Sequence, residues 1–183
     1  MKIANVIGEL ALVSAITAPK SKGQNYIKIH LITEREEIEK IGSRMIEIGK
    51  NRKDPFFIRD GKSVLKSDGL ILIGIKEWEP VGLNCGACGF DRCITMKDSK
   101  KFRDFEAPIC ALRYMDLGIA MGSLVKTLSI LNVDNRIMYR AGVVAKELQI
   151  IDFNVVMAIP FSISGKNIYF DREVPRIEED EVT

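Results

Sequence analysis

Four cysteines stand in a pattern that suits metal or redox chemistry. Three of them, Cys85, Cys88 and Cys93, lie in the stretch GLNCGACGFDRC, and the fourth is Cys110 in EAPIC, which makes the spacing C-x2-C-x4-C-x16-C. Three cysteines within nine positions are not expected of scattered core residues. In a reducing compartment, clustered thiols indicate metal or redox chemistry more often than structural disulfides. The pattern therefore predicts a metal or cluster site.

The spacing favours an iron–sulfur cluster over zinc. A structural zinc site usually draws its cysteines from two C-x2-C pairs, whereas this chain has three cysteines in the first group and one in the second. Iron–sulfur clusters are held by four thiolates, commonly three close in sequence and one remote. Structural zinc remains the alternative, and the spacing alone does not settle how many irons a cluster would contain.

The residues between the cysteines suit a loop that wraps around an inorganic core. Gly86 and Gly89 each follow a cysteine directly, and glycine permits the positive φ angles that a tightly curled backbone needs. Phe90 and Ile94 are expected to cover the site from water, which tunes the potential of a cluster. Pro108, two residues before the last cysteine, is expected to fix the approach of that ligand.

The segment LNCGACGFDRC … APIC resembles the small four-iron–four-sulfur domain of electron-transport complex subunits and corrinoid iron–sulfur proteins. Those domains share the run Cys-Gly-x-Cys-Gly, a third cysteine four residues on and a fourth about sixteen residues later. The resemblance covers about thirty residues. It implies that Cys85, Cys88, Cys93 and Cys110 are the ligands of one [4Fe-4S] cluster.

Composition indicates an ordinary globular chain of 183 residues, with 46% hydrophobic residues and a net charge of +2. This small charge argues against a nucleic-acid or acidic-membrane partner. The apolar N-terminus is interrupted by Asn5 and Glu9, so we expect a helix there and no export signal. The later stretch LGIAMGSLV is too short to span a bilayer. We therefore expect a cytoplasmic protein that does not bind a membrane.

Helix and strand patterns alternate without a clear linker, which predicts a single domain over 1–183 with an inserted segment at 78–111 that carries the cysteines. Thr33 and Glu36 resemble a capping box. The run 70–76 is expected to be a strand covered on both faces, and 112–132 a helix buried nearly all round. Predicted helices are 2–17, 34–50, 112–132 and 143–150, and predicted strands are 26–33, 70–76 and 153–160, the last ended by Pro160.

Outside the cysteine segment, the chain resembles flavin-dependent nitroreductase-like proteins. The similar parts are APKSKGQNYIKIHLITEREEIEKIG, MDLGIAMGSLVKTLSIL and VVMAIPFSISGKN, and as a whole the chain is similar to uncharacterised ferredoxin-domain-containing proteins. This resemblance implies an α/β (α+β) fold, a nitroreductase-like three-layer mixed sheet with helices, and a homodimer. It also makes FMN a candidate cofactor.

The flavin family usually opens with arginines that grip the FMN phosphate, but this chain has no arginine before Arg35. Lysines, a hydroxyl and backbone N–H groups are able to replace them. The alternative is that both candidate loops are solvated turns. The candidate flavin residues are Lys20, Ser21, Lys22, Gly23, Gln24 and Asn25 in one loop, and Lys166 and Asn167 in another.

Other catalytic chemistry has little support. His30 is the single histidine and lies in a predicted strand, so no Ser-His-Asp or Cys-His arrangement is expected. Asp116, near a helix start, is expected to compensate the helix dipole. The chain is therefore predicted to transfer electrons, as a carrier for an unknown redox partner protein or as the electron-entry part of a flavin reductase. The alternatives are a zinc-binding interaction module and an iron–sulfur redox sensor.

Overall fold

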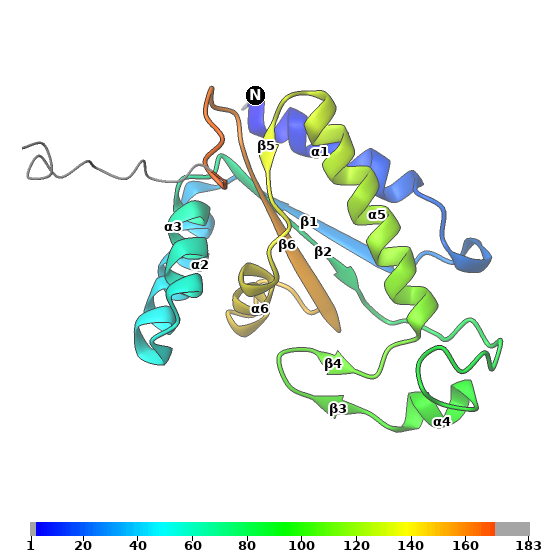
Figure 1. The fold of residues 1–183 in the computed structure, drawn as a ribbon. Helices are drawn as coiled ribbons and strands as arrows, with labels where there is room; N and C mark the ends of the chain where they lie inside the picture. Colours follow the sequence, from blue (N-terminus) through cyan, green and yellow to red (C-terminus); the bar gives the residue numbers. More distant parts are fainter. Residues whose placement is uncertain (1–2, 171–183) are drawn as a thin grey trace, which may run out of the picture.

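A four-stranded sheet lies between two layers of helices in the computed structural model, which describes residues 3–170 (Figure 1). The strands run in the order β1-β2-β6-β5, and every pairing in this sheet is antiparallel. The expected fold class is therefore observed, although the sheet holds no parallel pair within the described residues. The strands are β1 Ile27–Ile32, β2 Gly69–Ile75, β5 Asp134–Asn135 and β6 Val155–Ser162.

One face of the sheet is covered by α1, Ile3–Thr17, and α5, Ala111–Ile130, which lie side by side (Figure 1). Ile71, Ile73 and Ile75 of β2 belong to the hydrophobic cluster on this face. Small residues on α1 let the helix approach the sheet closely. The helix residues buried here are Ala4, Ala11, Ala15, Leu117, Ala120, Leu124 and Leu128.

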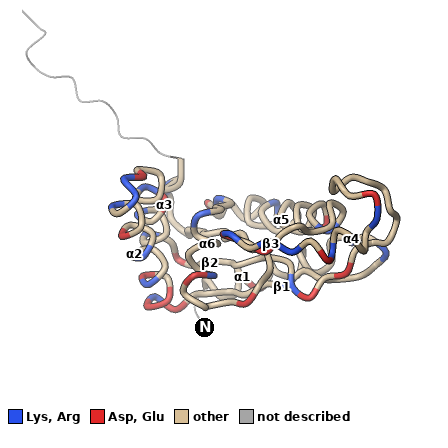
Figure 2. The backbone as a smooth tube through the Cα atoms, turned by 90° about the horizontal axis from the view of Figure 1, so that it is seen from below, with Lys and Arg blue, Asp and Glu red and all other residues tan. Residues whose placement is uncertain are grey.

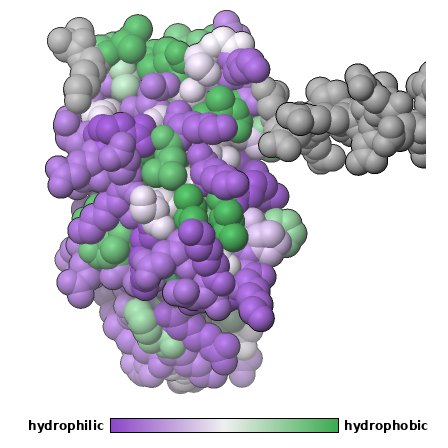
Figure 3. All heavy atoms as spheres, turned by 90° about the vertical axis from the view of Figure 1, so that its left-hand side faces the viewer, coloured by the Kyte–Doolittle hydropathy of each residue, from purple (hydrophilic) through white to green (hydrophobic). Residues whose placement is uncertain are grey.

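The other face is covered by α2, Arg35–Arg52, α3, Pro55–Leu65, and α6, Tyr139–Glu147. Leu70 and Leu72 of β2 point into the cluster on this side. Because side chains alternate along a strand, β2 serves both cores at once, which confirms the prediction that 70–76 is covered on both faces. The outer surface of this layer is mostly hydrophilic, with scattered apolar residues (Figure 3).

The sheet requires a glycine at position 74. A Cβ atom built there would lie 2.0 Å from the carbonyl oxygen of Val155, which is on the paired strand β6. No side chain fits in that space without moving the backbone of one strand.

Residues 78–111, which we call the cysteine segment, connect β2 to α5 at the lower right of Figure 1. The segment contains α4, Cys93–Asp98, and a short hairpin of β3, Lys101–Phe102, with β4, Glu106–Ala107. The sequence predicted neither the helix nor the hairpin. Two-residue strands leave too little periodicity to be recognised.

The helix α3 was also not predicted, although its start carries a recognisable signal. The side chain of Asp54 accepts hydrogen bonds from the backbone N–H groups of Phe56 (2.8 Å) and Phe57 (3.4 Å), and Pro55 occupies the first helical position. This is the usual arrangement of an N-cap followed by proline.

Two local predictions are wrong. The Thr33 hydroxyl donates to the side chain of Asn5, and α2 starts after Glu34 without a side-chain cap, so the expected capping box is absent. Strand β6 does not end at Pro160 but continues to Ser162. The proline is tolerated because its missing N–H faces Arg136, beyond the end of β5, so no hydrogen bond between β2 and β6 is lost; its carbonyl accepts a hydrogen bond from the N–H of Arg136 (3.3 Å).

The helix α5 is not buried all round, contrary to the prediction. It lies in an outer layer, where only one side meets the sheet and α1. Met115 and Ile119 are 59% and 45% exposed, and Ile130 near the end of the helix is 67% exposed. Among the described residues, no helix combines the length and hydrophobicity that crossing a bilayer would require.

Candidate functional site

The four cysteines belong to one segment but differ in exposure. Cys85 is exposed, Cys88 and Cys93 are half-buried, and Cys110 is 5% exposed. All four are free thiols. Cys93 is the first residue of α4, and Cys110 immediately precedes α5. The segment therefore offers thiols on a surface loop together with one thiol fixed at the edge of the core.

The loop between Cys85 and Cys93 curls as the sequence predicted. Gly86 and Gly89 have φ angles of 72° and 82°, and the N–H of Gly89 donates to the carbonyl of Gly86 (2.8 Å). Asn84 was not singled out from the sequence. Its side-chain oxygen accepts a hydrogen bond from the N–H of Cys93 (2.9 Å), and this bond closes the base of the loop.

A small apolar cluster brings two of the cysteines together. Cys110 is buried with Val81 and Met96, and Cys88 packs against this group. The remaining side chains that pack against it are Trp78, Phe90 and Leu112. The expectation that Phe90 covers the site agrees with this packing. Ile94 is 59% exposed, so its covering role stays a prediction for the cluster-bound form, whereas Met96, two residues later, is fully buried in the apolar cluster.

The donor set fits an iron–sulfur cluster in its chemistry, since it consists of four thiols beside an apolar cluster. Within residues 3–170, no three cysteine, histidine, aspartate or glutamate side chains already stand close enough to hold one metal ion. Binding by all four cysteines therefore requires the loop to close toward Cys110. The positive φ angles at Gly86 and Gly89, together with the absence of any atom within 4 Å of a built Cβ there, leave room for that movement.

Arg113, three residues after Cys110, is a buried side chain near the thiols that the sequence did not single out. Its side chain is 1% exposed and lies over the ring of Tyr26, 4.6 Å from the centroid. It donates to the carbonyls of Glu79 (2.8 Å) and Ser21 (3.0 Å) and to the side-chain oxygen of Gln24 (2.5 Å). Arg113 therefore joins the cysteine segment to the loop that was expected to bind FMN.

Asp116 completes this buried group. Its carboxylate is 3.2 Å from Arg113 and accepts hydrogen bonds from the N–H and the hydroxyl of Ser21, both 2.8 Å. The expectation that Asp116 compensates the helix dipole is therefore wrong. The sequence does contain a signal for this buried pair. Arg113 and Asp116 stand three residues apart near the start of a mostly apolar helix, and charged side chains that become buried on such a helix need a partner of opposite charge.

The loop Lys20–Asn25 is largely engaged in internal contacts. Lys20 donates through Nζ to the carbonyls of Ala15 and Ile16 (both 2.6 Å), at the C-terminal end of α1. Burial lowers the pKa of the Lys20 ammonium below its usual value, although the charge of Asp116 acts in the opposite direction. The side chain of Asn25 accepts from the N–H of Ile27 (3.0 Å). Lys22 is exposed within the turn η1, Ser21–Gly23, so it is the lysine of this loop that a ligand can reach.

The second candidate loop, with Lys166 and Asn167, lies at the other end of the sheet (Figure 1). Ile27, just after the first loop, pairs with Ile75, whereas Phe161, just before the second loop, pairs with Gly69. These pairs mark the two ends of β2, which are about 20 Å apart at roughly 3.4 Å per residue. The two loops of one chain therefore cannot grip the same phosphate.

The hairpin of the cysteine segment is anchored to the sheet through Glu106. The Glu106 carboxylate accepts from the side chain of Asn154 (2.6 Å) and pairs with Lys100 (2.9 Å). The hydrogen bond from Lys100 lowers the pKa of Glu106, and the bond from Asn154 adds to this effect.

Both signs of charge occur along the described chain, from α2 and α3 to α4 (Figure 2).

Comparison with known proteins extends these observations. Residues 106–172 match a family described as an uncharacterized protein containing a ferredoxin domain, and the matched part includes Cys110. An uncharacterized protein of Archaeoglobus fulgidus is 50% identical over 160 residues, which cover 87% of this chain and 86% of that protein.

Solved structures share the fold at low sequence identity. A nitroreductase with bound FMN from Desulfitobacterium hafniense has a TM-score of 0.59 at 10% identity, with 98% of this chain and 86% of that chain covered. A nitroreductase with bound FMN from Bacteroides fragilis has a TM-score of 0.56 at 9% identity, with 100% and 88% covered. The chain therefore has a nitroreductase-like fold and belongs to the family of uncharacterized proteins that contain a ferredoxin domain.

Proposed function

We propose that this protein transfers electrons through one [4Fe-4S] cluster held by Cys85, Cys88, Cys93 and Cys110. The observation that carries the proposal is the set of four free thiols in one segment, with Cys88 and Cys110 already in one apolar cluster. A bound cluster would supply one-electron redox chemistry. The description of the family as containing a ferredoxin domain supports the same conclusion.

The residues around the thiols have separate tasks in this proposal. Gly86 and Gly89 allow the loop to curl and to turn its N–H groups inward. Val81 and Met96 keep water from the side of Cys110, which affects the potential of a cluster. Cys85 is exposed, so an unknown redox partner protein would approach from that side. A cytoplasmic location belongs to the proposal, because four thiolate ligands require reduced cysteines.

FMN is proposed as a second cofactor, which would make the protein a flavin-linked oxidoreductase. The support is the shared fold with nitroreductases that bind FMN. Of the two candidate loops, Lys20–Asn25 is joined to the cysteine segment through Arg113, whereas the loop with Lys166 lies at the far end of β2. We therefore expect the FMN phosphate at Lys22 and Gly23, with Ser21, Gln24 and Asn25 shaping the loop.

A homodimer is proposed from the outer face of α1 and α5. Apolar side chains are exposed on both helices, and two helices that pack together with bare apolar faces are typical of an interface. These side chains include Leu10, Val13 and Ile16 of α1 and Met115 and Ile119 of α5, between 45% and 59% exposed.

Sedimentation analysis tests this interface. The double variant Met115→Gln with Ile119→Gln is expected to be monomeric, whereas Phe56→Gln, at an exposed apolar position on α3 in the opposite layer, should remain a dimer. A monomeric wild-type protein would refute the interface.

The cluster is tested by purification without air, followed by iron, sulfide and zinc analysis and absorbance spectroscopy. We expect four irons and four sulfides per chain, together with a broad absorbance band at roughly 400 nm that dithionite bleaches. Cys110→Ser should lose iron almost as completely as Cys85→Ser. Stoichiometric zinc without iron would refute the cluster in favour of an interaction module. A cluster that is destroyed by air, in a protein without reductase activity, would favour the sensor instead of the reductase.

A further inference from the structure

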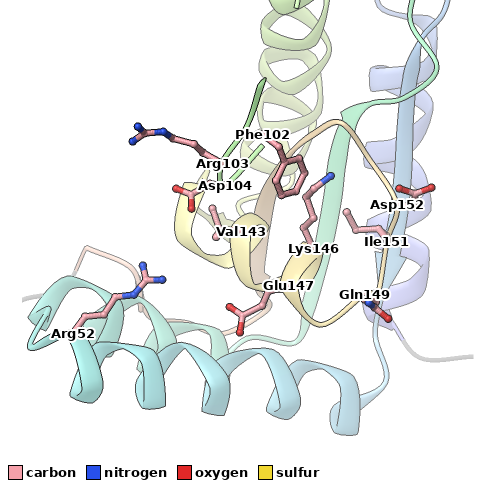
Figure 4. A pocket seen from close by; sticks show the side chains of 10 residues that line it. All are labelled: Arg52, Phe102, Arg103, Asp104, Val143, Lys146, Glu147, Gln149, Ile151 and Asp152. Carbon is pink, nitrogen blue, oxygen red and sulfur yellow. The ribbon is translucent and has the colours of Figure 1, made fainter. Parts of the chain in front are cut away.

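A cavity of about 600 Å³ lies between the hairpin of the cysteine segment and α6 (Figure 4). None of its lining residues is a cysteine or belongs to either candidate flavin loop. Its walls come from the end of α2, from β3 with the turn that follows it, and from α6 with the loop after α6. The volume lies within the range of about 300–1,000 Å³ typical of small-molecule sites.

The apolar part of the wall centres on Phe102. This side chain is 70% exposed, and one face of its ring is approached by the Lys146 ammonium, 5.6 Å from the centroid. Val143 and Ile151 add apolar surface to the same cavity. An aromatic ring left this open to water is stabilised when a flat partner covers it, because aromatic rings bury a large area and favour stacked or edge-to-face contacts.

Each acidic group of the wall has a partner, but among the residues that the structure describes only Glu147 and Asp152 are paired with a cation. Glu147 pairs with Arg44, and Asp104 accepts a hydrogen bond from the hydroxyl of Tyr139. The third acid, Asp152, lies 3.4 Å from the ammonium of Lys76.

Two guanidinium groups of the wall lack such partners. Within residues 3–170, the side chains of Arg52 and Arg103 make no ion pair and no hydrogen bond; Arg52 lies only over the ring of Phe57, 5.7 Å from its centroid. Figure 4 shows both arginines on one side of the cavity, with the Asp104 carboxylate between them and Phe102 nearer the middle. An anion is the ligand that two such groups recognise best, since a guanidinium group binds phosphate or carboxylate in a bidentate manner.

We propose that this cavity binds a small aromatic anion, that is, a flat ring that carries a phosphate or carboxylate group. The ring packs against Phe102, and the anionic group lies on the side of the cavity that carries Arg52 and Arg103. Because Phe102 and Arg103 belong to the hairpin that leads to Cys110, the ligand would hold this hairpin against α6. The proposal does not depend on the identity of the group bound by the cysteines.

Phenyl phosphate is a suitable probe, and phenol and inorganic phosphate are its two halves. In a titration of the full chain followed by amide chemical shifts, phenyl phosphate should shift the signals of Phe102, Val143 and Ile151. It should bind at least about tenfold more tightly than either half, since both parts of the site contribute. No saturable shift at millimolar probe, or equal affinity for inorganic phosphate alone, would overturn the proposal.

Variants locate the anionic end of the ligand. Arg52→Ala combined with Arg103→Ala should weaken phenyl phosphate binding about tenfold or more, as expected for the loss of partly screened charge-assisted contacts. Lys40→Ala removes the same sign of charge from an exposed position on the same helix as Arg52 and should leave the affinity unchanged. Phe102→Leu should weaken phenyl phosphate but not inorganic phosphate. Unchanged affinity in the double arginine variant would refute the assignment.

Discussion

Replacing Arg113 with methionine tests whether the cysteine segment is held to the main fold by a buried ionic group. Methionine is long enough to retain much of the packing, so the variant mainly removes charge and hydrogen bonds. The lost contacts are those to Glu79, Ser21, Gln24 and Asp116. The cation–π contact with Tyr26 is lost as well.

The expected loss in the free energy of unfolding follows from the groups that Arg113→Met leaves without a partner. Asp116 is 3% exposed and would keep its two hydrogen bonds from Ser21, but its charge would no longer be compensated by Arg113. Removing one partner of a buried ion pair costs about 3–5 kcal/mol. The carbonyl of Glu79 belongs to a largely exposed residue, so water can replace the guanidinium there at little cost. We therefore expect a loss of about 3–5 kcal/mol in the free energy of unfolding.

Urea unfolding of the metal-free, reduced protein, followed by far-UV circular dichroism, measures this loss. The double variant Arg113→Met with Asp116→Leu should lose less stability than the two single variants together, because each single substitution leaves the other charge buried without its partner. Arg92→Met, at an exposed position in the same segment, should change stability by no more than about 0.5 kcal/mol. A loss below about 1 kcal/mol for Arg113→Met would show that this ion pair does not hold the segment.

Three further outcomes are expected. Gly74→Ala should lower the free energy of unfolding by about 1–3 kcal/mol or more, because its methyl group meets the Val155 carbonyl at 2.0 Å; a neutral result in urea unfolding would contradict the observed strand pairing. If FMN binds, Lys22→Ala should weaken it about tenfold in a flavin-fluorescence titration and Lys166→Ala should not; the reverse result would move the phosphate to the other loop. Because the pKa of Glu106 is lowered on folding, its carboxylate stabilises the protein above the unfolded pKa of about 4.3, and this contribution is lost as the pH falls through the folded value. The free energies of unfolding of wild type and Glu106→Gln, measured against pH, should therefore converge in acid. A difference between them that stays constant down to about pH 3 would contradict this linkage.

Several features of the protein could be predicted from the sequence because they depend on local chemistry. The positive φ angles at Gly86 and Gly89 follow from their place between cysteines, and both are observed. The strand 70–76 was predicted to be covered on both faces because it is apolar at nearly every position, and the two hydrophobic clusters confirm it. Patterns of this kind lie within one segment, so they need no knowledge of what packs against it.

Errors arose where the surroundings of an element decide the outcome. A continuously apolar helix at 112–132 predicts burial on all sides, but the place of α5 in an outer layer leaves Met115 and Ile119 exposed. Pro160 was expected to end its strand. A strand accommodates proline, however, where the neighbouring strands need only its carbonyl as a hydrogen-bond acceptor and not an N–H donor. Neither fact is encoded in the residues of the element itself.

The sequence by itself determined the thiol set, the tight loop that carries it and the alternation of helix and strand around it. Only the tertiary structure decided how distant segments meet. Arg113 contacts Ser21 and Gln24 about ninety positions away, the two candidate flavin loops lie at opposite ends of β2, and a cavity forms where the cysteine segment faces α6. The physical reason is that contacts between remote segments depend on the packing of the sheet and its helices, which side-chain spacing along a single segment does not specify.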